Sequence, residues 1–152
     1  INKILIVLGE PQSIFSELLF KYFKSKEFSK NKKKIILIGS KNLFQKQMKK
    51  LRYNFNLKLI KNLNEAKINK LNFLEVNYNS TKIFSKLSHS SKKYISNCFE
   101  LAINLIKKNK NIALINGPVS KKHFLILPPL KNFGNGSMVH YTVGYIQRMI
   151  FF

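Results

Sequence analysis

Residues 3–24 read KILIVLGEPQSIFSELLFKYFK and contain the pattern that decides the fold. The continuous apolar run at 3–8 predicts a buried strand, and the Gly-Glu-Pro sequence after it predicts a turn. Residues 13–24 then show helical spacing, with Ser13 as the expected N-cap. The apolar stripe expected on this helix comprises Ile14, Leu18, Leu19, Tyr22 and Phe23. A buried strand that passes through a short turn into an amphipathic helix is typical of α/β proteins.

The same alternation of strand and helix continues along the chain. Further apolar runs predict strands at 35–38 and 112–115, and residues 57–60 and 72–76 are additional strand candidates. Helical spacing predicts helices at 41–51 and 91–109. Because the runs IILI at 35–38 and IALI at 112–115 are apolar throughout, we expect both to be buried. The sequence therefore predicts an α/β fold with a largely parallel sheet and helices on both faces.

Each of these two helices is expected to turn one apolar face toward the core. The first would bury Leu43, Phe44, Met48 and Leu51. The second would bury Tyr94, Ile95, Cys98, Phe99, Ala102, Ile103, Leu105 and Ile106. Ser88, Ser90 and Ser91 precede or open the second helix, and at least one of them is expected to cap it.

The composition excludes several kinds of site. The 152 residues include six acidic side chains, all of them Glu, so that no site in this chain can use Asp. Cys98 is the single cysteine and lies on the apolar face of a predicted helix, where a core position is expected. His89, His123 and His140 lack the spacing of metal ligands. No apolar run is long enough to cross a membrane, and a cytoplasmic location is expected.

The formal net charge of +22 allows two interpretations. Clustered lysines bind the phosphates of nucleic acids, so a small basic nucleic-acid-binding module is one of them. The other is drift of the composition toward residues with A/T-rich codons, which the many Lys and Asn residues favour. Only two of the 28 basic residues are Arg, whereas proteins that read bases use Arg for its two-pronged hydrogen bonding. We therefore expect drift to explain most of the charge.

Candidate binding residues follow two predicted strands. In a parallel sheet, ligands bind beyond the carboxyl ends of the strands. Glu10 lies in the turn after the first strand, and Asn116 and Lys121 lie in the segment NGPVSK after the strand at 112–115. An amide, a lysine and free N–H groups at a helix start suit a phosphate or a carboxylate, although an ordinary turn accounts for the same residues. Neither nucleotide-binding glycine fingerprint is present.

Three motifs in this order resemble the N-terminal part of the 4-hydroxythreonine-4-phosphate dehydrogenase family. The family pattern G-[DE]-P-x-x-I-x-x-E is matched by Gly9, Glu10, Pro11, Ile14 and Glu17. A family G-K-x-S element corresponds to residues 85–88, SKLS, where the glycine is absent. The pattern A-[IL]-[VI]-T-x-P-[VI]-x-K corresponds to residues 113–121, ALINGPVSK, with Asn116 in place of Thr.

The resemblance implies a fold like that of isocitrate and isopropylmalate dehydrogenases, an α/β/α arrangement that is incomplete in this chain. It also implies a homodimer that oxidises and decarboxylates 4-phosphohydroxy-L-threonine in pyridoxal phosphate biosynthesis. The family's cofactors are NAD or NADP and a divalent metal such as Zn, Mg or Co. Glu10, Asn116 and Lys121 become substrate-binding candidates. The catalytic residues are not identified, and the cofactor and metal sites of the family are expected to lie outside this chain.

The resemblance divides the chain into residues 1–124, the N-terminal part of the dehydrogenase fold, and residues 125–152. The second segment departs from the family pattern and ends in two phenylalanines. We expect a divergent, irregular tail there, and a chain that is part of a longer protein or has an altered end. Besides an incomplete dehydrogenase, the sequence leaves open the nucleic-acid-binding module and an inactive paralogue that dimerises.

Overall fold

The computed structural model describes residues 1–79, 83–84 and 88–120. The chain divides into two units, Ile1–Pro118 and Val119–Phe152, and the helices and strands described here belong to the first. Its strands are β1 (Lys3–Val7), β2 (Lys34–Gly39), β3 (Leu57–Leu59), β4 (Leu71–Glu75) and β5 (Ile112–Asn116). They form one sheet in the order β3-β4-β2-β1-β5, and every pair is parallel. The predicted parallel α/β architecture is confirmed.

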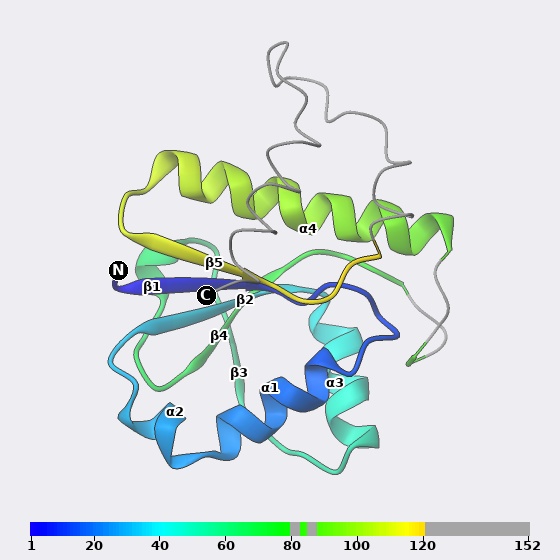
Figure 1. The fold of residues 1–152 in the computed structure, drawn as a ribbon, viewed down its shortest axis with the longest axis horizontal. Coiled ribbons are helices and arrows are strands. Elements are labelled where there is room, and N and C mark those ends of the chain that lie inside the picture. Colours follow the sequence, from blue (N-terminus) through cyan, green and yellow to red (C-terminus); the bar gives the residue numbers. More distant parts are fainter. Residues whose placement is uncertain (80–82, 85–87, 121–152) are drawn as a thin grey trace. The chain divides into compact units, whose positions relative to one another are not determined.

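Helices cover both faces of this sheet, as predicted (Figure 1). Helix α4 (His89–Lys108) lies across one face. The other face carries α1 (Phe15–Lys24), the short α2 (Lys26–Lys30) and α3 (Lys41–Lys50). A 3-10 turn (Leu63–Glu65) connects β3 to β4. The bounds of the strands and of α1, α3 and α4 agree with the sequence prediction to within two residues.

Aromatic side chains form much of the core between the sheet and the α1 and α3 helices. The ring of Phe20 on α1 lies 4.9 Å from the ring of Phe44 on α3, and Phe44 lies 5.7 Å from Phe73 on β4. All three rings are fully buried. Because side chains alternate between the faces of a strand, β1 and β2 also supply residues to the layer beneath α4. That layer includes Leu5, Val7, Ile36 and Ile38.

The predicted inward face of α1 is partly wrong. Leu19 and Phe23 are buried as expected, but Ile14 and Leu18 are 69% and 53% exposed, and Tyr22 is also exposed. The buried positions are Ser16, Leu19, Phe20 and Phe23. Two apolar rows with helical spacing run along this helix, and spacing alone does not distinguish them. The row with Phe20 turns inward because its ring packs against Phe44 and the neighbouring aromatic side chains.

The faces predicted for α3 and α4 are largely confirmed. Leu43, Phe44 and Met48 are buried on α3, while Leu51 lies just beyond its end and is partly buried. Helix α4 buries its predicted residues from Tyr94 to Ala102, and the later ones are half-buried. Ser88 caps α4 in a capping box with Ser91, as the serines before this helix suggested. The N-cap of α1 is Ile14 instead of Ser13.

Strand β5 is less buried than its apolar sequence predicts. Four of its residues are half-buried, and Ile115 is 42% exposed. Within the described residues β5 pairs only with β1, so one of its edges has no neighbouring strand there. The edge position explains why an apolar run gives a half-exposed strand.

Several predictions concern residues outside the described ranges. They include the irregular tail at 125–152, the residues Lys121, His123 and His140, and most of the SKLS element. Val119 and Ser120 are described and belong to no helix or strand. None of the described helices has both the length and the apolar character that a membrane crossing requires.

Candidate functional site

Three neighbouring strands of the sheet end beside one another, and each end carries a glycine. Gly39 is the last residue of β2, Gly117 directly follows β5, and Gly9 follows β1 by two residues. Since β1 lies between β2 and β5 and all three are parallel, their carboxyl ends meet at one edge of the sheet. Ligands bind at this edge in open α/β sheets, so the sequence and the fold indicate the same region.

The turns after β1 and β5 approach each other too closely for side chains. Gly9 has a φ of 73°, and a Cβ atom there would stand 2.7 Å from the carbonyl oxygen of Pro118. A Cβ atom on Gly117 would overlap the carbonyl oxygen of Leu8. The N–H of Gly117 donates to the Val7 carbonyl at 2.7 Å. Only glycine allows the two backbones to cross in this way.

Glu10, one of the predicted substrate-binding residues, is held at this crossing. Its backbone N–H donates to the Pro118 carbonyl at 3.1 Å, which ties the β1 turn to the β5 turn. Its carboxylate accepts a hydrogen bond of 3.3 Å from the side-chain amide of Gln12. The residue is only 9% exposed. A carboxylate is therefore fixed at the carboxyl edge of the sheet.

Asn116, the second candidate, is the last residue of β5 and lies opposite Val7 of β1 in the sheet register. Its amide nitrogen donates to the Gly117 carbonyl at 3.1 Å. The structure thus brings Asn116 and Glu10 to adjacent strand ends. The sequence placed each of them after a strand but did not predict that β1 and β5 are neighbours. Lys121, the third candidate, lies outside the described residues.

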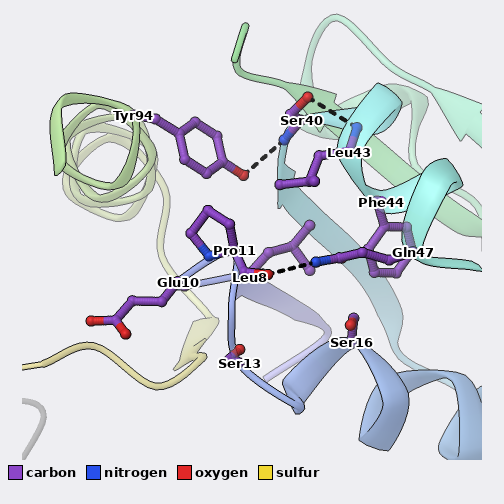
Figure 2. Close-up of a pocket in the computed structure, with 11 residues that line it drawn as sticks. Leu8, Glu10, Pro11, Ser13, Ser16, Ser40, Leu43, Phe44, Gln47 and Tyr94 are labelled. Carbon is purple, nitrogen blue, oxygen red and sulfur yellow. Dashed lines mark hydrogen bonds between the residues drawn. The ribbon is translucent and has the colours of Figure 1, made fainter. Parts of the chain in front are cut away.

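A pocket lies on the α3 side of the same edge (Figure 2). Its empty volume is about 270 Å³, part of which is open solvent. The turn after β1, the first turn of α1, the end of β2, α3 and Tyr94 of α4 form its walls. The side-chain amide of Gln47 donates to the Pro11 carbonyl at 2.9 Å, which fastens α3 to the β1 turn. The sequence did not indicate that Gln47 or Ser16 would be buried here.

Tyr94 and Glu75 fix the far wall of the pocket at the start of α3. The Ser40 N–H donates to the Tyr94 hydroxyl oxygen at 2.9 Å, and burial raises the pKa of Tyr94 well above its usual value. The carboxylate of Glu75 accepts from the Lys41 N–H at 3.0 Å. Partial burial raises the pKa of Glu75, and the hydrogen bond from Lys41 opposes that effect. These contacts position Ser40, which caps α3 by accepting from the Leu43 N–H.

Cys98 and His89 do not belong to this site. Cys98 is 2% exposed, which confirms its predicted core position. Its burial raises the pKa of the thiol to about 12, so the thiolate is not available as a nucleophile near neutral pH. His89 is the exposed first residue of α4.

The described residues do not fit the metal that the resemblance implies. Over residues 1–79, 83–84 and 88–120, no group of three His, Cys, Asp or Glu side chains is close enough together to hold an ion. The turn at Gly9 also lacks the further glycines of a dinucleotide fingerprint. What this edge of the sheet offers chemically is a fixed carboxylate, an amide and the starts of two helices.

Comparison with known proteins shows which proteins this chain is similar to. A family model described as pyridoxal phosphate biosynthetic protein PdxA matches residues 31–144. Among the solved structures, a 4-hydroxythreonine-4-phosphate dehydrogenase from Burkholderia phymatum is similar with a TM-score of 0.72 and 14% identity, over 95% of this chain. The enzyme of the same name from Klebsiella pneumoniae gives a TM-score of 0.70 and 12% identity, over 94% of this chain.

These similarities differ in what they establish. At such identities the solved structures show the fold alone, and this chain spans 44% of the length of each of them. The search of the curated proteins found no match. The family model, however, covers most of the chain, including β2 to β5 and the segment after Asn116. The chain belongs to the PdxA family of pyridoxal phosphate biosynthetic proteins.

Proposed function

We propose that this chain is an incomplete copy of a 4-hydroxythreonine-4-phosphate dehydrogenase and contributes part of its substrate site. The reaction would be the NAD- or NADP-dependent oxidation of 4-phosphohydroxy-L-threonine, with decarboxylation, in pyridoxal phosphate biosynthesis. The observation that carries the proposal is the family match over residues 31–144. The fold supports it, because the solved structures that share this fold bear that enzyme's name.

The substrate combines an ammonium group, a carboxylate, a hydroxyl and a phosphate, and each needs a partner of suitable charge. Glu10 offers a carboxylate that suits the ammonium group. Asn116 offers an amide that can donate to or accept from the hydroxyl or the carboxylate. Lys121 offers a cation for the phosphate. In this proposal the crossing of the β1 and β5 turns sets the spacing between Glu10 and Asn116.

The cofactor and the metal belong to the proposed whole enzyme. The described residues provide neither a metal-ligand cluster nor a dinucleotide fingerprint, so we assign no step through either group to them. A homodimer in the cytoplasm is the proposed setting of the complete enzyme.

Binding of the substrate to the full 152-residue chain tests the proposal. We expect 4-phosphohydroxy-L-threonine to bind in calorimetric titrations, and Glu10→Ala and Asn116→Ala each to weaken binding at least tenfold. Glu27→Ala and Asn77→Ala change the same residue types at exposed positions and should bind as the parent chain does. A folded chain that does not bind the substrate, or binds it equally well in the Glu10 and Asn116 variants, would contradict the proposal.

Turnover distinguishes an incomplete copy from other members of the family. The chain is mixed with NAD, a divalent metal and 4-phosphohydroxy-L-threonine, and formation of NADH is followed by absorbance. We expect substrate binding without turnover, because the described residues provide neither a group of metal ligands nor a dinucleotide fingerprint. Sustained turnover would show that the chain is a working enzyme by itself.

A further inference from the structure

The hydroxyl of Ser16 is buried without a hydrogen-bond partner. Ser16 lies in the first turn of α1 and is 6% exposed. Its Oγ atom is the one buried side-chain oxygen or nitrogen in the described part of the chain for which no partner is found. Polar groups in such positions are normally paired, because leaving one unpaired is costly. An unpaired hydroxyl that lines a pocket therefore points to a bound group that completes it.

The N-terminus of α1, a helix of ten residues, lies at the same pocket. No side chain caps this helix at its N-cap residue, Ile14. Ser13 accepts only a long hydrogen bond of 3.4 Å from the N–H of Phe15. The first N–H groups of a helix have no partner within it, and the helix dipole places positive potential at this end. The start of α1 thus offers donors to the pocket in which the Ser16 hydroxyl lies (Figure 2).

We propose that this pocket binds an oxyanion, a phosphate or carboxylate group, through the Ser16 hydroxyl and the N-terminus of α1. Ser16 donates to one oxygen of the anion, and the first-turn N–H groups donate to the others. The pairing satisfies the buried hydroxyl and places negative charge at the positive end of the helix. This site lies on the α1 and α3 side of Glu10 and does not rest on the proposed dehydrogenase function.

The charges around the pocket are compatible with an anion. Figure 2 shows the carboxylate of Glu10 directed away from Ser16. Glu17, the other acidic residue near the start of α1, pairs with Lys21 at 2.8 Å. The pocket does not suit a cation, because it combines the positive end of a helix with no carboxylate directed into it.

Titration of the full chain with inorganic phosphate tests the site. Amide chemical shifts are recorded by two-dimensional NMR at constant ionic strength, because a chain of net charge +22 attracts anions everywhere. We expect saturable changes at the amides of residues 15–17. Ser16→Ala should weaken this binding at least tenfold and leave the fold intact. Ser29→Ala removes an exposed hydroxyl from α2 and should leave the affinity unchanged.

Acetate forms a second arm of the experiment and tells the two anion classes apart. Tighter binding of phosphate would assign the site to phosphate groups, and tighter binding of acetate would assign it to carboxylates. Equal affinity in the Ser16→Ala and parent chains would overturn the proposal. Chemical-shift changes confined to lysine-rich segments of the parent chain would also overturn the proposal. This second result does not depend on a variant. If the chain binds inorganic phosphate but does not bind 4-phosphohydroxy-L-threonine, the result counts only against the dehydrogenase proposal.

Discussion

The hydroxyl oxygen of Tyr94 accepts a hydrogen bond from the backbone N–H of Ser40 at 2.9 Å, although 54 positions separate the two residues. The bond connects α4, on one face of the sheet, to the end of β2 and the start of α3. Both residues are buried, and both line the pocket. Through this bond, Tyr94 on α4 fixes the position of the turn at which α3 begins.

Replacing Tyr94 by Phe should destabilise the protein. The change leaves the buried Ser40 N–H without its acceptor, and an unsatisfied buried donor costs about 1–3 kcal/mol. Urea unfolding followed by circular dichroism measures the difference. Tyr53→Phe, at a half-buried aromatic position, serves as the matched control and should cost less. Equal stability of Tyr94→Phe and the parent chain would mean that another group satisfies this N–H.

Substitution of Gly117 should be more damaging than substitution of Gly39. A Cβ atom on Gly117 meets backbone atoms of Leu8, which cannot move without displacing β1. A Cβ atom on Gly39 meets the end of the Leu8 side chain at 2.7 Å and the Tyr94 hydroxyl at 2.8 Å, and side chains can shift. Overpacking costs about 1–3 kcal/mol or more, so we expect Gly117→Ala to approach or exceed the upper value. Thermal unfolding of both variants measures which of them loses more stability. A larger loss in Gly39→Ala than in Gly117→Ala would contradict the expectation.

The buried thiol of Cys98 should make stability fall at alkaline pH. Its pKa is raised from 9.0 to about 12 in the folded protein, so above pH 9 the unfolded chain loses this proton while the folded one retains it. The folded state then binds more protons, and stability decreases with pH by at most about 1.4 kcal/mol per unit between pH 9 and 12. Unfolding free energies of the parent chain and Cys98→Ala between pH 8 and 10 isolate the thiol. Parallel curves for the two chains would contradict the expectation.

The side chain of Asn72 should stabilise the packing of β4 beside β2. It is fully buried, its amide nitrogen donates to the Ile35, Lys67 and Lys70 carbonyls, and its oxygen accepts from the Lys67 N–H at 2.9 Å. Asn72→Ala leaves these groups unpaired and should cost about 1–3 kcal/mol or more. Asn77→Ala, at an exposed position after β4, should change stability little. Chemical denaturation compares the two, and similar losses would show that the hydrogen bonds of Asn72 contribute little.

The architecture was predictable because β1, β2 and β5 are built on compact apolar runs that alternate with segments of helical spacing. That Glu10 and Asn116 lie at the same edge followed from the same pattern, since the carboxyl ends of parallel strands meet at one edge. That β1 and β5 are neighbours is a finding of the structure. The face of α1 was not predictable, because Leu18 and Phe20 both belong to apolar rows with helical spacing. Only the packing of Phe20 against Phe44 selects the row that is buried.

The pocket itself could not be predicted from the sequence. Ser16 and Gln47 are polar residues on helices, and patterning assigns such residues to solvent. Their burial depends on what the tertiary fold places opposite them, which for Gln47 is the carbonyl of Pro11, 36 positions away. The bond between Tyr94 and Ser40 is likewise a consequence of topology, because no local pattern relates the two residues.

The three glycines at the ends of β1, β2 and β5 limit which codon changes this gene can accept. A coding sequence that drifts toward A/T-rich codons gains lysine and asparagine and loses glycine, whose codons begin with two guanines. Residues 1–120 retain glycine only at positions 9, 39 and 117. At each of them an added Cβ atom would lie less than 3 Å from another atom. Purifying selection for a foldable chain is therefore expected to act on these codons whether or not the encoded protein still catalyses a reaction.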